Sequence, residues 1–394
     1  MKKLLLIGIN TREMINSAVK LNYEIYSTSY FSTYDTIKLK NEKHILHQEK
    51  NKSCGRFEEE YNVNELLELS LEYMDEVDYI IPISGISPSD FKGSFKKYKS
   101  KILGNKNIEN IENKFRFYKK IKGEFLTPET FHVNDIEEAI EIAKNKKENQ
   151  YIIKPVQGSG GYGVNLLNKY SANQINDSQK GWLMQEYIEG INLSSSTLST
   201  KSKVKNLVNS RLLVQNDLKN ENGFIYIGNI LPLDKKSILT KRKEINIEKL
   251  NNAMSETSEN LIKKLKLIGS NGVDYILSKK GLYLIEVNPR LQGTYECCES
   301  VLKINMLEAH IKACQNELIA ININYNGYSY KKIIYSKDKL KFKEINLNNI
   351  YDIPYPGAII EKNQPYLTLI ENNKDFNDLC KNIEIASNVI KKTN

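Results

Sequence analysis

The sequence lacks a hydrophobic run long enough to cross a membrane. No stretch of its 394 residues approaches the roughly 20 consecutive apolar residues that a membrane-spanning helix needs. The apolar run at residues 4–9 follows two lysines, as in a signal peptide, but it is short and carries no small-residue cleavage site. We therefore expect a cytoplasmic protein without a membrane partner, in which residues 4–9 form a buried strand of a parallel sheet.

Cysteine is also scarce, and its pattern excludes two kinds of site. The five cysteines form no C-x-x-C pair and no zinc-binding spacing, which is typical of reduced thiols. The formal net charge is +9, but the lysines are interspersed with Glu and Asn and do not gather with aromatic residues into a stripe. We therefore expect no zinc site, no disulfide framework and no nucleic acid partner.

The first 110 residues contain an alternation of strands and helices. Apolar stretches that are typical of strands lie at residues 4–9, 24–28 and 77–83. Residues 11–21 and 63–74 have the pattern of helices, so the segment predicts a parallel sheet with helical crossovers. Open sheets of this kind bind ligands at the carboxyl ends of their strands. The corresponding loops are candidates for substrate contact: residues 8–12, 29–35 and 84–90.

A glycine-rich loop follows a strand that contains a lysine. The loop, residues 156–164, comes directly after the strand of Lys154 and has the spacing G-x-G-x-x-G. A dinucleotide fingerprint would open a helix, whereas residues 164–167 are typical of a returning strand, and no Gly-Lys-Ser/Thr completes a Walker loop. One interpretation is a plain hairpin. The other is a flap whose backbone N–H groups close on phosphate oxygens beside the lysine charge.

Two predicted strands further along carry oxygen atoms suited to a hard cation. The pattern G-x-D ends at Asp274, and the pattern E-x-N-P-R contains Glu286, Asn288 and Arg290. Alternation along a strand puts Glu286 and Asn288 on one face, and the preceding strand can bring Asp274 beside them. A solvated strand end is one interpretation of E-x-N alone. Two carboxylates and an amide are also suitable ligands for Mg²⁺ that carries a nucleotide phosphate.

Taken in order, these motifs resemble the ATP-grasp superfamily over roughly residues 113–317. The set comprises a helix-borne lysine, a strand lysine before a glycine flap, a strand ending in Gln-Glu-Tyr-Ile-Glu-Gly, and G-x-D paired with E-x-N-P-R. The segment Gln-Gly-Thr-Tyr-Glu after N-P-R is similar to that of the predicted carboligase-like ATP-grasp proteins of methane-producing archaea. Each motif alone is weak, whereas the ordered set is specific.

The resemblance implies an α/β fold, with α+β character in the ATP-grasp part. It divides the chain into an N-terminal Rossmann-like domain with a parallel sheet at residues 1–110, a lid subdomain with the flap at 111–190, and a metal and substrate subdomain at 191–320. Residues 321–394 combine alternating aromatic or aliphatic residues and lysines with proline and asparagine turns. This pattern predicts a small β-rich C-terminal region with a terminal helix, which we expect to be structural.

The resemblance also implies roles for individual residues. The phosphates of ATP would contact two lysines and the flap backbone: Lys114, Lys154, Ser159, Gly160 and Gly161. The adenine edge would meet the hinge: Gln185, Glu186, Tyr187 and Ile188. The ribose contact is open between Glu189 and Asn192, because Asn192 stands where the family often has a glutamate. Asp274, Glu286 and Asn288 would bind Mg²⁺ (or Mn²⁺), and Arg290 with Lys154 would stabilise the phosphoryl group in flight.

The implied activity is ATP-dependent ligation of a carboxylic acid to an amine through an acyl phosphate, in a pathway such as cofactor biosynthesis. This chemistry needs charge neutralisation and alignment, which suits a candidate site with no Ser-His or Cys-His pair. The expected partners are a small-molecule acid, a small-molecule amine and a second copy of the chain in a homodimer. A nucleotide-binding regulatory protein without turnover and a phosphotransferase are the alternatives.

Three basic residues between the hinge and the metal-binding strands are candidates for holding an anionic substrate: Arg211, Lys241 and Arg242. Arg211 lies in an apolar strand, and a buried arginine needs an anionic partner. Lys241 and Arg242 are equally well explained as surface charges.

Overall fold

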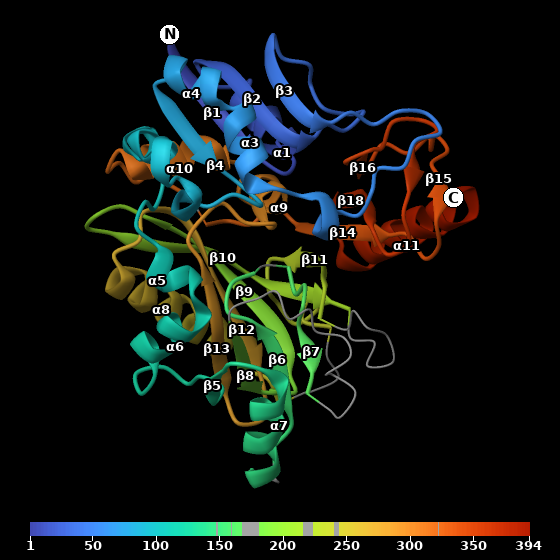
Figure 1. The fold of residues 1–394 in the computed structure, drawn as a ribbon. Helices are drawn as coiled ribbons and strands as arrows, with labels where there is room; N and C mark the ends of the chain where they lie inside the picture. Colours follow the sequence, from blue (N-terminus) through green and yellow to red (C-terminus); the bar gives the residue numbers. More distant parts are fainter. Residues whose placement is uncertain (147–148, 159, 168–180, 216–223, 240–243, 322) are drawn as a thin grey trace.

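A four-stranded parallel sheet forms the N-terminal part of the computed structural model (Figure 1), which describes residues 1–146, 149–158, 160–167, 181–215, 224–239, 244–321 and 323–394. Its strands lie in the order β3 (Asn41–Leu46), β2 (Tyr23–Phe31), β1 (Lys2–Gly8) and β4 (Tyr79–Pro82). In β1, Leu4 and Leu6 belong to one hydrophobic core, whereas Leu5 and Ile7 belong to another. The continuous apolar run is therefore buried on both faces of the sheet, as expected for a central parallel strand.

Helices cover both faces of this sheet. On one face, α1 (Arg12–Ala18) contributes apolar side chains to the core of Leu4. On the other face lie α3 (Val63–Leu69) and α4 (Leu71–Glu76), which replace the single helix expected at residues 63–74 because Ser70 ends the first helix and its hydroxyl donates to the Leu66 carbonyl at 2.6 Å. The remaining helical segments are short: α2 (Phe57–Glu60), η1 (Pro88–Asp90) and η2 (Gly93–Lys101).

A smaller antiparallel sheet forms the lid. Its strands lie in the order β5 (Thr130–Val133), β8 (Trp182–Glu186), β6 (Tyr151–Pro155) and β7 (Asn165–Leu166). Three helices accompany it: α5 (Glu109–Glu112), α6 (Lys114–Ile121) and α7 (Ile136–Asn145). Because β6 and β7 are antiparallel, the glycine-rich loop joins a strand to a returning strand and does not open a helix. The structure thus agrees with rejecting a dinucleotide fingerprint here.

An eight-stranded sheet makes up most of the remaining chain. Its order is β13 (Leu282–Asn288), β12 (Gly269–Leu277), β9 (Ile191–Ser199), β10 (Val204–Val214), β11 (Tyr226–Leu231), β14 (Tyr328–Tyr335), β18 (Pro365–Asn373) and β16 (Ile350–Tyr351). The last three strands come from the C-terminal region, which therefore continues the large sheet. A separate pair, β15 (Leu340–Lys341) and β17 (Ile359–Ile360), lies beside them. The predicted α/β class with a β-rich C-terminal region is confirmed.

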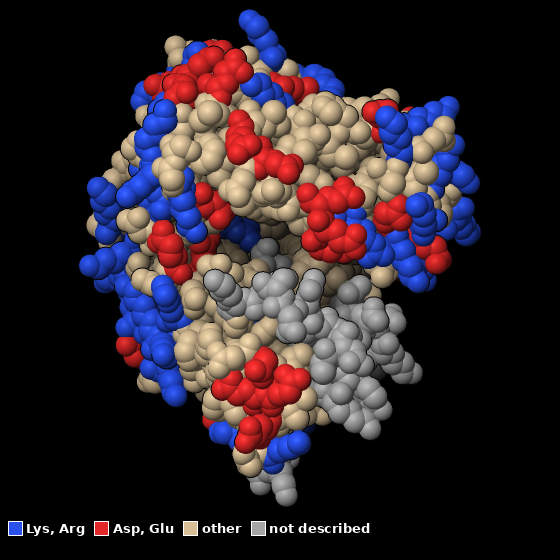
Figure 2. All heavy atoms as spheres, in the orientation of Figure 1, with Lys and Arg blue, Asp and Glu red and all other residues tan. Residues whose placement is uncertain are grey.

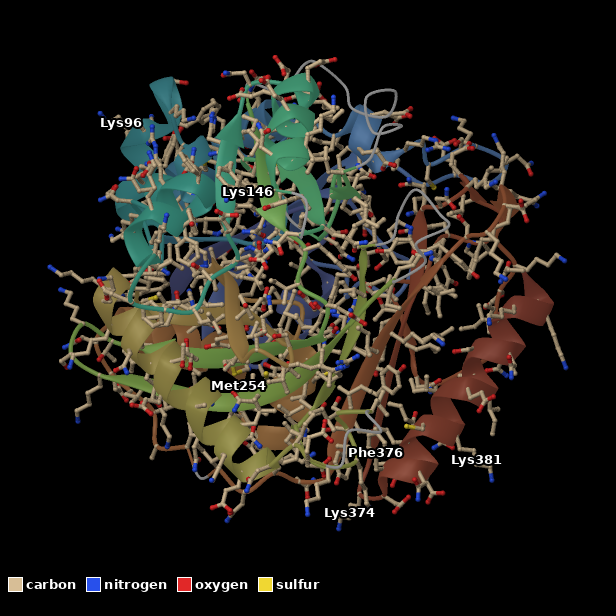
Figure 3. All side chains as sticks on the ribbon, turned by 90° about the horizontal axis from the view of Figure 1, so that it is seen from below. Lys96, Lys146, Met254, Lys374, Phe376 and Lys381 are labelled. Carbon is tan, nitrogen blue, oxygen red and sulfur yellow. The ribbon has the colours of Figure 1, made fainter. Side chains whose placement is uncertain are left out.

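Four helices accompany the large sheet: α8 (Ile247–Leu265), α9 (Tyr295–Leu302), α10 (Met306–Cys314) and α11 (Phe376–Thr393). Figure 3 shows α8, which carries Met254, and α11, which carries Phe376 and Lys381, lying along the strands. Met254 and Phe376 are buried, whereas Lys381 is exposed. In both helices the apolar stripe meets the sheet and the charged stripe meets water, so amphipathicity determines the packing face.

The surface shows two features that bear on function. Lys and Arg side chains gather along the edge that carries α5, α6 and α8, and the molecule is hollowed between the N-terminal domain and the lid (Figure 2). Within the described ranges, no helix combines the length and the apolar character that crossing a membrane requires.

Candidate active site

Two half-buried carboxylates face each other across β12 and β13. The register of this antiparallel pair sets Asp274 directly opposite Glu286, so the two side chains lie on the same face of the sheet. The Ser194 hydroxyl donates to Asp274 at 2.6 Å, and the Asn288 amide donates to its second oxygen at 2.8 Å. Burial first and the nearby Glu286 carboxylate second raise the pKa of Asp274 to about 7, against the effect of these hydrogen bonds.

The glycine of the G-x-D pattern has a steric role. A Cβ atom on Gly272 would lie 1.0 Å from the side-chain amide nitrogen of Gln292. The absence of a side chain at Gly272 therefore lets the Gln292 side chain, in the loop after Arg290, pack against β12. The Ser196 hydroxyl donates to the side-chain amide oxygen (Oε1) of Gln292 at 3.0 Å and holds this loop at the end of the carboxylate strands.

Two lysines approach the carboxylates from the lid. Asn113 caps α6 by accepting from the Arg116 N–H, which places Lys114 at the start of the helix. The Lys114 ammonium lies 3.2 Å from Glu286 and donates to the Gly158 carbonyl at 2.7 Å. Lys154 of β6 is 5% exposed and donates to Gln185 at 2.7 Å. Burial lowers the pKa of Lys154 to about 8, and the Lys114 charge acts in the same direction.

The glycine-rich loop lies against the large sheet. The Tyr226 N–H donates to the Gly160 carbonyl at 3.0 Å. A Cβ atom on Gly161, whose φ is +82°, would lie 2.0 Å from the Phe224 carbonyl oxygen, so this approach also requires glycine. Ser159, which the resemblance placed on the γ phosphate, lies outside the described residues.

The hinge after β8 borders a slot with apolar walls. The Tyr187 N–H donates to the Gln150 carbonyl at 2.8 Å, so an adenine edge would meet other groups of this hinge. The Tyr187 ring lies edge-on to Phe224, with centroids 6.2 Å apart. Aliphatic side chains from both sheets complete the slot: Ile152, Leu212, Val214, Ile276 and Ile285. A flat heterocycle fits between such walls, with polar hinge groups at its edge.

The structure also places the residues whose roles the sequence left open. Asn192 lines the same cavity, whereas Glu189 is exposed and does not line it. Arg211 does not line it either, because its neighbours Leu212 and Val214 on β10 do and alternation turns Arg211 to the opposite face. The expectation that Arg211 holds a substrate is not supported by this position. Lys241 and Arg242 lie outside the described residues.

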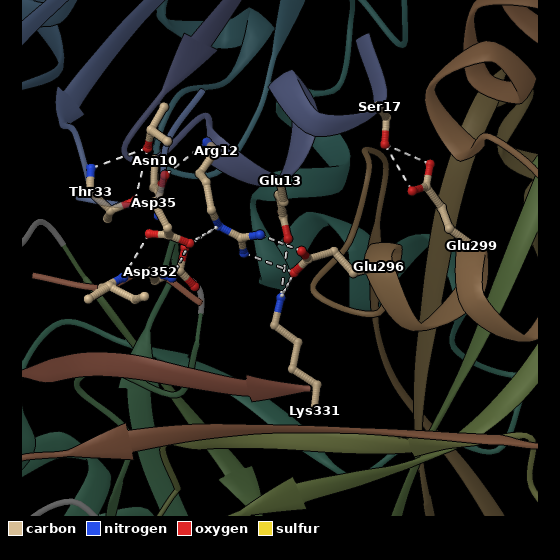
Figure 4. Close-up of polar contacts among 12 residues, drawn as sticks. Asn10, Arg12, Glu13, Ser17, Thr33, Asp35, Glu296, Glu299, Lys331 and Asp352 are labelled. Atoms are coloured by element: carbon tan, nitrogen blue, oxygen red, sulfur yellow. Dashed lines mark hydrogen bonds and ion pairs between the residues drawn. The ribbon is translucent and has the colours of Figure 1, made fainter. Parts of the chain in front are cut away.

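A buried ion network, which the motifs did not predict, joins the N-terminal domain to the C-terminal region (Figure 4). The Arg12 guanidinium donates to both oxygens of Glu296, at 2.6 and 3.0 Å, and to Asp352 at 2.8 Å. Lys331 lies 3.1 Å from Glu13 and 3.2 Å from Glu296. Burial raises the pKa of Asp352, but the Arg12 charge and hydrogen bond more than offset this and hold it at about 2.

One cavity of about 640 Å³ brings these groups together. Apart from Glu189 and Arg211, its lining includes the predicted site residues that the structure describes: Lys114, Lys154, Gly160, Gly161, Gln185, Glu186, Tyr187, Ile188, Asn192, Asp274, Glu286, Asn288 and Arg290. It also includes Asn10, Glu13, Lys331 and Asp352 of the ion-network region. A second cavity of about 410 Å³, beside the loop at residues 84–90, shares Lys114, Glu286, Asn288 and Arg290 with the first. These four residues therefore lie where two cavities meet.

Two sheets enclose an apolar slot, and a pair of lysines and a pair of carboxylates lie beside it. This combination defines a nucleotide-dependent enzyme of the ligase class. The chain belongs to the ATP-grasp family. A family model described as an ATP-grasp domain matches residues 111–294. An uncharacterized protein of Methanocaldococcus jannaschii is 30% identical over 95% of this chain and 90% of its own length. Tyramine–L-glutamate ligase of the same organism is 26% identical over 81% of this chain and 83% of its own length.

Solved structures share the fold along the whole chain. The biotin carboxylase domain of Hydrogenobacter thermophilus 2-oxoglutarate carboxylase, solved with MgADP and bicarbonate, covers 98% of this chain and 89% of its own, with a TM-score of 0.72 and 18% identity. N5-carboxyaminoimidazole ribonucleotide synthetase of Thermotoga maritima covers 99% and 98%, with a TM-score of 0.68 and 14% identity. ATP and Mg²⁺ are the cofactors of this family.

Proposed function

We propose that this protein is an ATP-dependent carboxylate–amine ligase that joins a small-molecule acid to an amine through an acyl phosphate. The observation that carries the proposal is the convergence of Lys114, Lys154, Asp274, Glu286 and Arg290 on one cavity beside an apolar slot. The related tyramine–L-glutamate ligase supports the same class of reaction.

The nucleotide would lie between the lid and the large sheet. Its adenine enters the slot bounded by Tyr187 and Phe224, and its phosphates point toward Lys114 and Lys154. In the structure Lys114 is paired with Glu286 and Gly158, so it would reorient toward the phosphates when they arrive. Lysine supplies a compact positive charge of the kind that phosphate oxygens accept.

The carboxylate pair fits a divalent cation. Asp274 and Glu286 are opposed across the strands and half-buried, and burial and the Glu286 charge raise the pKa of Asp274, so a divalent cation bound between them would relieve the repulsion of the pair. Within the described part of the chain no group of three or more His, Cys, Asp and Glu residues is placed to hold a metal, so the third protein ligand here would be the amide of Asn288. Mg²⁺ held by these three residues would neutralise phosphate charge.

The reaction then needs alignment and charge stabilisation from the protein. An oxygen of the acid attacks the γ phosphorus, the bond to the bridging oxygen breaks, and ADP leaves. The amine nitrogen then attacks the acyl carbon, inorganic phosphate leaves, and the amine gives up a proton to form the amide. Arg290, which lines both cavities, is positioned to stabilise charge on the transferring phosphoryl group.

Product analysis tests this function directly. The full chain is incubated with MgATP and with panels of acids and amines, and ADP, phosphate and amide are measured. We expect release of ADP and phosphate, and formation of amide, only when a matching acid and amine are both present. A stable phosphorylated acid or alcohol instead of free phosphate would identify a phosphotransferase. Nucleotide binding without turnover across the panel would favour a regulatory protein.

The pKa of Lys154 leads to a pH-dependent affinity for nucleotide. Because this pKa is lowered to about 8 by burial first and by Lys114 second, the ammonium is present below about pH 7 and is lost as the pH rises through 8. We expect the association constant for MgATP to fall by up to about tenfold per pH unit above pH 8. Calorimetric titrations between pH 6.5 and 9.5 measure this.

Two variants separate Lys154 from other titrating groups. Lys154→Met should bind MgATP weakly with a nearly flat pH profile, whereas Lys144→Met, which removes an exposed charge from α7, should keep the original profile. A flat profile in the unmodified protein would show that Lys154 does not contact the phosphates.

A further inference from the structure

The main cavity extends well beyond the space that a nucleotide needs. β12 carries Asp274, and β14 lies four places along the same sheet. Neighbouring strands are about 4.8 Å apart, so the two strands are separated by about 19 Å. Residues of both strands line the one cavity, which therefore runs from the nucleotide slot to the C-terminal region. The far end, which we call the C-terminal compartment, is bounded by the N-terminal domain and by β14 and β18 of the C-terminal region.

Aromatic rings form much of the wall of this compartment. Tyr30 and Phe57 come from the N-terminal domain, and Tyr335 and Tyr366 come from the C-terminal region. The rings of Tyr30 and Phe57 are 5.8 Å apart in an edge-on arrangement, so each holds the other in place. The Tyr335 hydroxyl donates to the Tyr226 carbonyl at 3.1 Å, which leaves its ring facing the cavity. Rigid aromatic walls of this kind accept a flat apolar group.

The polar end of the compartment carries excess negative charge. The ion network contains two cations, Arg12 and Lys331, and four carboxylates, those of Glu13, Asp35, Glu296 and Asp352, which leaves a net charge of 2 − 4 = −2. Both cations have carboxylate partners: Lys331 contacts Glu13, and Arg12 contacts Asp352. Glu13, Asp352 and Lys331 line the cavity, and the excess of carboxylates leaves this wall negative. A ligand that brings a positive charge would balance this wall, and a second carboxylate would be repelled by it.

Chain connectivity ties this wall to the reacting centre. Arg290, Gln292 and Thr294 line the cavity in sequence, and α9 follows at once with Glu296, which holds Arg12. The loop at residues 290–294 therefore connects the ion network to the Arg290 end of the cavity.

We propose that the C-terminal compartment binds the amine substrate and that this substrate is an arylalkylamine, with its ring between the aromatic walls and its ammonium group beside Glu13 and Asp352, where the Glu13 carboxylate accepts the proton that the nitrogen must lose before it attacks the acyl carbon. The inference rests on the proposed function, since it names the amine of the same ligation. It also gives the C-terminal region a role in substrate choice, in place of the purely structural role that its sequence predicted.

A calorimetric titration of three matched ligands tests the inference. 2-Phenylethylamine carries both the ring and the charge, 2-phenylethanol lacks the charge, and ethylamine lacks the ring. Each is titrated into the full chain, with and without the non-hydrolysable analogue MgAMP-PNP. We expect 2-phenylethylamine to bind at least about tenfold more tightly than either of the others, because a charged hydrogen bond and a buried ring each contribute about that factor.

Three variants assign this affinity to residues. Glu13→Gln should lower the affinity for 2-phenylethylamine about tenfold and leave the affinity for 2-phenylethanol unchanged. Phe57→Leu should lower the affinity for both ring-bearing ligands. If Glu13→Gln folds poorly, this second variant still tests the compartment. Glu68→Gln, which removes an exposed carboxylate from α3, is the control and should change nothing.

The outcomes for the amine and for the ligase reaction are distinguishable. Binding of MgAMP-PNP without preference for 2-phenylethylamine would overturn the arylalkylamine assignment and leave the ligase proposal standing. Failure to bind MgAMP-PNP would contradict the ligase proposal, and the titrations without nucleotide would still test the compartment. Equal weakening of 2-phenylethylamine and 2-phenylethanol by Glu13→Gln would show that Glu13 does not hold the charge.

Discussion

Glu286→Gln should reduce turnover by about 10²- to 10³-fold while leaving the fold intact, because it removes one of the two charges that the metal site needs. The side chain keeps its shape, but the ion pair to Lys114 is lost and the opposed carboxylate pair becomes a single carboxylate. Release of ADP measures the rate, and the midpoint of thermal unfolding measures the fold.

The stability of this variant should change little because two effects oppose each other. Lys114 and Lys154 lose a negative neighbour, which costs free energy. Asp274, whose pKa is raised by burial and by Glu286, loses a repelling neighbour and becomes easier to ionise. Glu141→Gln, an exposed change in α7, provides the matched control and should keep full activity. A Glu286→Gln enzyme with near-normal turnover would end the assignment of Glu286 to the metal.

Glu286 shows what could be predicted from the sequence. Glu286 is part of a local pattern, because strand alternation and a hairpin are enough to bring it beside Asp274 and Asn288. The same is true of Lys154 before its flap. These motifs are short, their geometry is fixed by neighbouring residues, and the structure brings the described members of the predicted set, apart from Glu189 and Arg211, to one cavity.

The ion network could not be predicted in the same way. Arg12 meets Glu296 and Asp352, which are hundreds of residues away in the sequence. These contacts depend on how β14 and β18 join the large sheet, and no local pattern encodes that pairing. The only available signal was that Arg12 and Asp35 lie at the carboxyl ends of parallel strands, where open sheets bind ligands.

Arg211 illustrates a further limit of sequence patterns. Its position in an apolar strand correctly indicated partial burial, but alternation alone does not say which face of the strand meets the cavity. The aliphatic neighbours Leu212 and Val214 occupy the slot, so Arg211 takes the other face. The period-two pattern of a strand shows which side chains share a face. The packing of the second sheet decides which of the two faces borders the cavity.

The second large effect is expected for Arg12→Met, which should destabilise the protein by about 3–5 kcal/mol. Arg12 is 1% exposed and is the shared partner of Glu296 and Asp352 (Figure 4). Without it, four partly buried carboxylates face Lys331 alone. Methionine fills much of the same volume, so the loss measures the charge rather than a cavity. Denaturant unfolding at pH 7 measures the effect.

The pH dependence of this loss separates electrostatics from packing. In the unmodified protein the pKa of Asp352 is about 2, below its ordinary value of 3.8, so its contribution to stability is present above pH 4 and is lost as the pH falls toward 2. In Arg12→Met that contribution is absent and the partly buried carboxylates become easier to protonate, so the deficit should shrink between pH 7 and pH 4. Arg56→Met removes a half-exposed arginine whose carboxylate partners lie 3.9–4.0 Å away, and it should change stability by less than about 1 kcal/mol. A loss of stability that is the same at every pH would mean that Arg12 stabilises the domain junction by packing. It would also contradict the net negative charge inferred for the C-terminal compartment.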